Sequence, residues 1–317
     1  MDSRNNGCMP VSSDKRLPSA EAGSCGRFWR GALYGAAAVL GWSCFSVGST
    51  ASLAQGFRPE DLTMLRYGVS AVVCSPWLMR ARPANAGGLG WTRAFLLALA
   101  AGPLFGTLVN AGMLFAPLSH TAIMVPAVSM LGGMLAGRLF LDESVAAPRW
   151  AGAAIMTAGL VWLMLQGVHS PAMPYAWLGD CLFLIAGAMW ASYTFMLRRW
   201  NAEPVLAVSM VNAISGVLYF PVYLFLIHDH FPHIGWGAFG RAAILQGIIA
   251  AFLTVYAYSQ SVRFLGAARA AVLPAAVAPL TMTLGAITPG EFPAPQQMAA
   301  LALAMAGFMG AVGLWPW

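Results

Sequence analysis

Long apolar segments alternate with short polar connections along the chain, after a polar amino-terminal stretch of residues 1–28. Each apolar segment has close to the roughly 20 residues that an α-helix needs to cross a bilayer core of about 30 Å. The pattern therefore predicts an all-α integral membrane protein with ten transmembrane helices. Their expected ranges are 31–52, 62–80, 94–116, 118–141, 150–167, 176–197, 205–227, 242–262, 265–287 and 297–315.

Residues 1–28 have no apolar core of the kind that a secretory signal requires, and we expect a disordered cytosolic tail there. The composition agrees with the membrane assignment, because 59% of the residues are hydrophobic and only 9% are charged. Soluble domains carry about 25% charged residues. The mean hydropathy of +0.69 therefore excludes an ordinary soluble enzyme.

The distribution of basic residues predicts the orientation in the membrane. With the amino terminus in the cytosol, 14 basic residues fall on the cytosolic side, whereas only Arg58 and Arg241 fall outside. Basic residues concentrate on the cytosolic side of membrane proteins. We therefore expect a multi-pass protein of the plasma (inner) membrane with both termini cytosolic, and we attribute its net charge of +6 to topology rather than to nucleic-acid binding.

An internal repeat divides the apolar region into residues 31–167 and 176–315. Four residue pairs in corresponding spans share one offset of 148 residues: Trp42 and Trp190, Pro126 and Pro274, Glu143 and Glu291, Gly159 and Gly307. Each half holds five spans, and because five is odd the second half enters the membrane upside down. Inverted five-helix repeats are typical of transporters that bind substrate near the midplane and work by alternating access.

The repeated motifs resemble the EamA-type branch of the drug/metabolite transporter superfamily, with two EamA domains over residues 33–315. The resemblance is carried by Leu40–Ser43 and Ala188–Ala191, Leu65–Tyr67, the Pro126 and Pro274 segments, Leu141–Glu143 and Pro289–Glu291. One departure is Ile214, which stands in the second half where the first has Arg66. The resemblance implies an exporter or exchanger of small organic metabolites such as amino acids.

Two other function classes stay open from the residues alone: an intramembrane acyl- or glycosyltransferase and a small-molecule sensor. Against an enzyme, the chain has no HExxH and no GxSxG motif. The expected partners are a small-molecule substrate and the lipid bilayer. Small residues at Gly133 and Gly137, and at Ala302, Ala306 and Gly310, indicate close helix approach. Whether they also form a homodimer contact is left open.

The candidate substrate-binding residues are aromatic or polar side chains at membrane depth. Trp42 and Trp190 lie inside spans, where they either line a cavity or pack between helices. Arg66 either binds a substrate carboxylate or serves a structural role near Glu60, because an arginine within the membrane is costly. Polar groups at this depth need partners, water or substrate; the remaining candidates are Asn110, His120, Tyr193, Tyr256, Tyr258 and Gln260.

Pro126 and Pro274 interrupt helical hydrogen bonding at equivalent positions and are candidates for gating, although static kinks would leave the same pattern. Glu143 and Glu291 precede helix starts, where negative charge is stabilising. The cluster of His228, Asp229, His230 and His233 has the ligand types for zinc. Because it is an isolated loop cluster, we expect no metal, and we expect no cofactor.

Asp180 is the only acidic residue that enters an expected span, and His120 is the only histidine near a span interior. Ion-driven carriers often use a carboxylate deep in the membrane. The sequence therefore favours facilitated diffusion or exchange without a proton or sodium requirement, with an ion bound by Asp180 or by backbone carbonyls as the alternative.

The topology generates a direct prediction. Reporter fusions at Asn85 and after Trp317 should report the cytosol, because an even number of expected spans precedes each of them. A fusion at Pro232 should report the opposite side, because seven expected spans precede it. Alkaline phosphatase and green fluorescent protein activities distinguish the two compartments. A cytosolic signal at Pro232 contradicts the inverted repeat.

Overall fold

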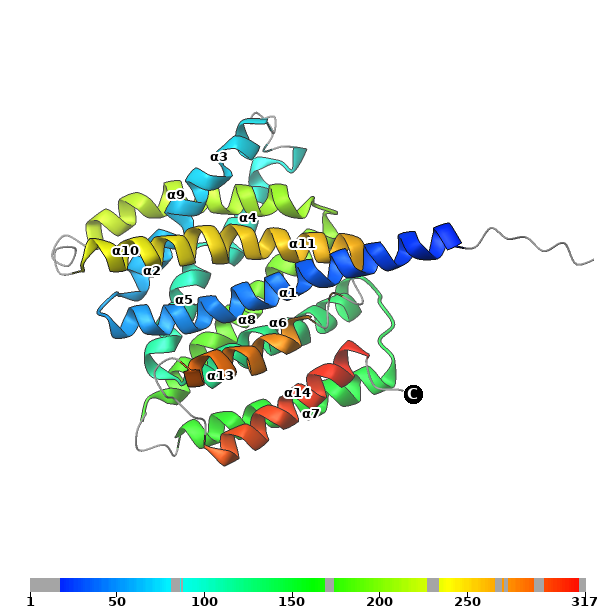
Figure 1. Ribbon diagram of the computed structural model, residues 1–317. Helices are drawn as coiled ribbons and strands as arrows, with labels where there is room; N and C mark the ends of the chain where they lie inside the picture. The colour runs from blue at the N-terminus through cyan, green and yellow to red at the C-terminus, as the bar shows by residue number, and fades with distance from the viewer. Residues whose placement is uncertain are drawn as a thin grey trace, which may run out of the picture.

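The computed structural model describes residues 18–80, 86, 88–168, 174–226, 234–265, 270, 273–287 and 294–313, and in these ranges every regular element is a helix. Figure 1 shows the helices packed side by side as a bundle. Their bounds are α1 Pro18–Ala54, α2 Pro59–Met64, η1 Leu65–Val69, α3 Ser70–Arg80, α4 Trp91–Ala101, α5 Pro103–Phe115, α6 Leu118–Phe140, α7 Ala147–Val168, α8 Ala176–Arg199, α9 Pro204–Leu226, α10 Trp236–Ala243, η4 Ile244–Leu253, α11 Thr254–Leu265, η5 Leu273–Ala276, α13 Val277–Ile287 and α14 Pro295–Val312.

The ten predicted spans are recovered as helical segments. Eight helices within the described ranges are long and apolar enough to cross a membrane, and the shorter apolar helix 273–287 is a ninth segment. The second span is the continuous helical stretch 59–80, in which α2, η1 and α3 follow one another. This stretch is less apolar than the others because it holds Glu60, Asp61, Arg66 and Arg80.

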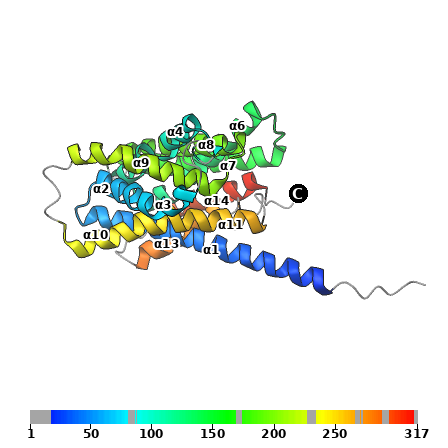
Figure 2. The ribbon, with the colours of Figure 1, turned by 90° about the horizontal axis from the view of Figure 1, so that it is seen from above.

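Two boundaries differ from the expectation. The eighth helical segment continues to Leu265, so the ninth span, expected from residue 265, has its described 3-10 and α-helical part only from Leu273. The first helix begins at Pro18, within the stretch 1–28 expected to be a tail. In both views its amino-terminal end projects past the other helices (Figures 1 and 2). Both differences arise because apolar composition identifies the part of a helix inside the membrane, whereas the helix itself can extend beyond that part at either end.

Several helices begin at prolines, whose fixed φ and missing N–H suit the first helical turn. Pro59, Pro103 and Pro295 occupy this place in α2, α5 and α14. In α2 the Asp61 carboxylate also accepts a hydrogen bond from the Arg58 backbone N–H at 2.8 Å. These prolines and the Asp61 hydrogen bond fix the residues at which the helices begin after the short loops.

The packing of the helices follows the internal repeat. The first helix of the first half, α1, packs on α11 and α13 of the second half. The first helix of the second half, α8, packs on α5 and α6 of the first half, which are the equivalent positions. The pairs α3 with α9 and α7 with α14 each join the same helix of the two repeats. Each half is therefore completed by the other.

Helices α7 and α14 lie side by side at one end of the bundle (Figure 1) and approach through glycines. A Cβ atom on Gly307 would lie 2.1 Å from the backbone nitrogen of Met156, and one on Gly159 would lie 2.5 Å from that of Ala304. Gly159 and Gly307 are one of the repeat pairs. The shared offset thus marks a close backbone contact between the two halves.

The predicted close approach at Gly133 and Gly137 was wrong within the described residues. A Cβ on Gly133 would meet nothing within 4 Å, and Gly137 adjoins the Glu143 side chain. In α14 the expected close approach holds for Gly310, which is buried and where a Cβ on Gly152 of α7 would lie 2.4 Å from the backbone carbon, whereas Ala302 and Ala306 are exposed. Spacing at fours identified a helix face but could not say which of the faces is buried.

We predict that Gly307→Ala destabilises the protein by about 1–3 kcal/mol, because the new methyl group overpacks the α7–α14 contact. The matched control is Gly133→Ala, which should cost nothing and gain up to about 1 kcal/mol from helix propensity. The thermal unfolding midpoints of the purified variants in detergent provide the comparison. Equal midpoints for the two variants would contradict the tight packing of this helix pair.

Candidate functional site

The two repeated tryptophans lie in separate aromatic contacts at mid-span. Trp42 of α1 packs against Tyr258 of α11, with ring centroids 5.2 Å apart. Trp190 of α8 packs against Phe105 of α5 and against Tyr193, in each case at 5.1 Å. The Trp42–Tyr258 and Trp190–Phe105 contacts join helices of different repeats, whereas Tyr193 lies on the same helix as Trp190. All of these side chains except Phe105 were candidates from the sequence. Each half therefore supplies an aromatic side chain to a contact with the other half.

Arg66 lies on η1 with only 8% of its surface exposed. Its guanidinium carbon is 4.9 Å from the centre of the Phe45 ring and 5.9 Å from that of Tyr67. Cation–π contacts contribute about 0.5–2 kcal/mol each. None of the ion pairs in the described part of the chain includes Arg66, so the expected alternative of a pair with Glu60 is not present there.

Tyr67 extends this region towards the second half. Its hydroxyl donates to the Ala101 backbone carbonyl at 2.7 Å, and its ring shares a buried cluster with Tyr193. Phe45 and Tyr193 stand 148 residues apart, three positions after the two tryptophans. Two aromatic rings of the first half thus adjoin the buried Arg66, and Tyr67 connects them to Tyr193 of the second half.

Two stretches of π-helix pack against each other beside Arg66. They are η1, which carries the arginine, and η4 in the eighth helical segment. A Cβ on Gly247 would lie 2.4 Å from the Cβ of Val69, so only glycine permits this approach. π-helical turns cost stability relative to α-helix and are frequent at functional sites.

Asn110, another candidate, is completely buried on α5. Its amide nitrogen lies 3.5 Å from the Thr63 hydroxyl, which also accepts a hydrogen bond from Thr107 at 3.2 Å. The amide oxygen has no partner within the described structure. A similar arrangement holds Gln246 of η4, whose amide nitrogen donates to Ser49 of α1 at 2.8 Å while its oxygen is unpartnered. Sequence reasoning missed Gln246.

His120 and Asp180, which the sequence analysis treated separately, lie together. Nδ1 of His120 is 2.7 Å from Oδ1 of Asp180, and both side chains are 0% exposed. They join the first turn of α6 to the second turn of α8. A different ion pair joins the other ends of this region, where Arg198 of α8 donates to Glu143 after α6. Glu143 is thus a salt-bridge partner of the second half.

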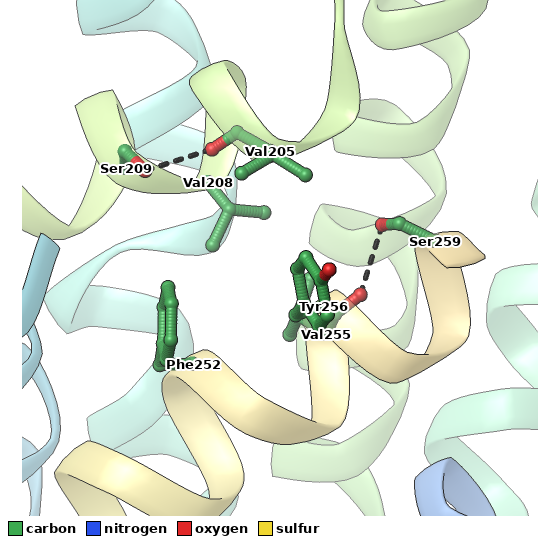
Figure 3. A pocket seen from close by; sticks show the side chains of 7 residues that line it. All are labelled: Val205, Val208, Ser209, Phe252, Val255, Tyr256 and Ser259. Atoms are coloured by element: carbon green, nitrogen blue, oxygen red, sulfur yellow. Dashed lines mark hydrogen bonds between the residues drawn. The ribbon is translucent and has the colours of Figure 1, made fainter. Parts of the chain in front are cut away.

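Tyr256 lines a narrow pocket between α9 and the eighth helical segment (Figure 3). Its ring contacts those of Tyr34 and Phe252, at 6.4 and 6.3 Å. The pocket is mostly apolar, with Ser209 and Ser259 as its other hydroxyl groups. Both serines donate to backbone carbonyls of their own helices (Figure 3). Gln260 lies one turn further along and is half-buried.

The two candidate gating prolines occupy different local structures. Pro126 lies within the continuous helix α6, whereas Pro274 lies in the 3-10 turn η5 that precedes α13. The repeat offset therefore does not give the two positions the same backbone conformation. Glu291 and the histidine-rich cluster at 228–233 lie outside the described residues.

The neighbours that sequence reasoning missed were mostly aromatic. Phe45 carries a detectable signal, because Phe45 and Tyr193 follow Trp42 and Trp190 at the same spacing. Phe105 and the role of Tyr67 carry none, since aromatic residues are common in apolar spans. Their positions depend on which helix faces meet in three dimensions.

Comparisons with known proteins agree with this architecture. The EamA-like transporter family matches residues 29–165 and 177–313, so that both ends of the match are displaced by 148 residues. No curated protein matches the chain. Among 17 matching chains of solved structures, one described as "Crystal structure of protein" is 17% identical, with a TM-score of 0.60 over 89% of this chain and 95% of that one.

That structural match supports the fold alone, because the identity is low. The family match rests on both halves and reproduces the offset that the sequence carries. Together the two matched segments cover most of the chain, and they coincide with the two sets of helices that complete each other. The protein is therefore a multi-pass membrane protein that belongs to the EamA-like transporter family.

Proposed function

We propose that this protein exports or exchanges small organic metabolites that carry a carboxylate, such as amino acids, by alternating access between its two inverted repeats. The single observation that carries this proposal is Arg66, a buried cation without an ionic partner among the described residues. Burying an unpaired charge costs several kcal/mol. The contacts with Phe45 and Tyr67 offset only part of that cost.

A substrate carboxylate would supply the missing negative charge. The planar guanidinium binds carboxylates with two parallel hydrogen bonds, a geometry that lysine does not provide. The aromatic side chains around it suit the apolar part of a small amphipathic solute. Phe45 lies beside Arg66, and Tyr67 leads to the cluster with Tyr193.

The alternating mechanism draws its support from the pairing of the halves. Trp42 with Tyr258, and Trp190 with Phe105, are contacts between α1 and α11 and between α8 and α5. These are equivalent helix pairs of the two repeats. Rocking of one half against the other would open one contact while the other closes, as in transporters with inverted repeats. We place the protein in the inner membrane with both termini cytosolic.

The other function classes make different predictions in vesicles. An intramembrane transferase changes its substrate chemically, and a sensor binds without moving it. Only a carrier exchanges labelled solute across a sealed membrane. Counterflow in proteoliposomes, with the recovered label checked by chromatography, therefore separates the three classes.

We predict that Arg66→Gln lowers counterflow of amino acids at least tenfold and that Arg66→Lys retains an intermediate rate. Each amino acid is assayed as unlabelled competitor beside the amine that lacks its carboxylate. The wild type should be inhibited by amino acids and hardly by the amines. Arg241→Gln is the matched control, because Arg241 is exposed at the start of the eighth helical segment. Equal competition by acids and amines would contradict a carboxylate site.

We also predict that Trp42→Ala and Trp190→Ala each lower transport at least tenfold, because each loses a ring that contacts the opposite repeat. Their melting temperatures should stay within about 4 °C of the wild type, which corresponds to roughly 1 kcal/mol. Trp162→Ala on α7 is the control, since that ring is 43% exposed. If both variants fail to fold, the tryptophans are packing residues only.

A further inference from the structure

The buried pair of His120 and Asp180 has one feature that a static clamp does not require. After the contact between Nδ1 and Oδ1, the other ring nitrogen of His120 and the other oxygen of Asp180 are buried without a hydrogen-bond partner in the described structure. Buried polar groups nearly always have partners, so exceptions need an explanation. Two such atoms on one ion pair indicate that the pair binds a small ligand or ion in part of the transport cycle.

Two further polar atoms without partners lie on the same helical turn as His120. The hydroxyl oxygens of Ser119 and Thr121, on either side of His120 in α6, are also buried and unpartnered. Helix α13 packs along this end of α6, where Leu118 lies against Gly285. The first turn of α6 thus forms a small buried polar region within apolar packing.

The charge of the pair depends on a single proton. With the carboxylate ionised, Nδ1 donates to Oδ1 and Nε2 is an acceptor, so the pair carries one negative charge. One added proton on Nε2 makes the pair neutral. A net charge is disfavoured in an environment of low dielectric constant. The unpartnered Nε2 can accept that proton, and a conformation that opens the pair to water would let it leave.

At this end of the bundle, no described residue of the helices packed against α6 or α8 supplies a positive charge that would balance the pair. Among these helices, the described residues of α5, α13 and α14 have no ionisable group. Arg93 and Arg149 lie in the first turns of α4 and α7, at the opposite membrane face on the expected topology. The others are Glu21, Cys25, Arg27, Arg30, Tyr34 and Cys44 on α1, Arg138 on α6, and Cys181, Tyr193, Arg198 and Arg199 on α8.

Of these groups, Cys181 is adjacent to Asp180 in sequence, and Cys44 lies near the middle of its helix. Neither forms a disulfide. Arg138 is 18 residues from His120 along α6, a distance of about 27 Å at 1.5 Å per residue. The proton is thus the simplest charge that neutralises the pair where it lies.

We propose that His120 and Asp180 form a proton-binding site that couples transport to the proton gradient across the membrane. One proton enters from water on one face, rests on the pair while it is buried, and leaves to the other face in the opposite conformation. The inference rests on the proposed transport function. It departs from the proton-independent mechanism that the sequence favoured, because the sequence did not reveal that the two residues meet.

The test uses the full-length protein in liposomes that contain the pH-sensitive dye pyranine. In the wild type, addition of a mixture of the twenty amino acids should change the internal pH, and an imposed pH gradient should drive accumulation of labelled amino acids. His120→Gln and Asp180→Asn should lower both at least tenfold while counterflow stays within about threefold of the wild type. Glu143→Gln is the matched control, since it removes the ion pair between Glu143 and Arg198 of α8. It should change neither the internal pH response nor the gradient-driven accumulation.

The outcomes separate the two proposals. Counterflow without any proton movement in the wild type overturns the proton site and leaves the transport proposal standing. Gradient-driven accumulation that survives in both variants also overturns it. If no amino acid shows counterflow, the transport proposal fails. A second measurement, which needs no substrate, then tests the proton site by itself.

That second measurement is a nitrogen-15 spectrum of a variant in which His169, His228, His230 and His233 are replaced by glutamine. The remaining imidazole of His120 should change from two protonated nitrogens to one as the pH is raised, and the change should be altered in Asp180→Asn. A spectrum that is constant between about pH 5 and 9 would show a static hydrogen bond and overturn the inference.

Discussion

Helices in a bilayer gain little by hiding apolar side chains from lipid tails that are equally apolar, so their association depends on close backbone approach and polar contacts. In this protein the approach is made possible by glycines at the seams between the two halves. Gly159 and Gly307 bring α7 and α14 together, and Gly41 leaves room for the Thr254 side chain between α1 and α11. Every other feature of the site depends on these seams, because they fix which faces of the two repeats meet.

The same solvent determines how polar groups are distributed. Many hydroxyl groups of the spans donate to carbonyls one turn earlier, as Ser46, Ser52 and Thr157 do, and thereby cost little. Several groups depart from this pattern. The His120–Asp180 pair joins the two halves, whereas the side chains in contact with Arg66 and Asn110 belong to the first half. Relative movement of the repeats would therefore change the surroundings of the His120–Asp180 pair directly.

The length of the apolar segments and the repeat offset determined how much of the fold could be predicted from the sequence. Length and apolarity were sufficient for ten spans, and the 148-residue offset was sufficient for the repeat, but it did not predict that Gly159 and Gly307 lie against the opposite helix. Apolarity and offset were not sufficient for His120 and Asp180, which lie on different helices and share no offset with a second pair. The face of α6 that carries Gly133 was misassigned, because a motif gives spacing but not surroundings. The π-helical turns left no sequence signal, since they arise from packing of η1 against η4.

The exchange of helices between halves also sets the order in which this protein can mature. Ser43 of α1 donates to the Val277 carbonyl of α13, a residue 234 positions later. At synthesis rates of about 5–20 residues per second, α1 resides in the bilayer for roughly 10–50 seconds before that acceptor exists. During this time its serines and Trp42 face lipid or helices that they will later leave. The contacts of α1 with α11 and α13 can therefore form only after the second half of the chain has been made.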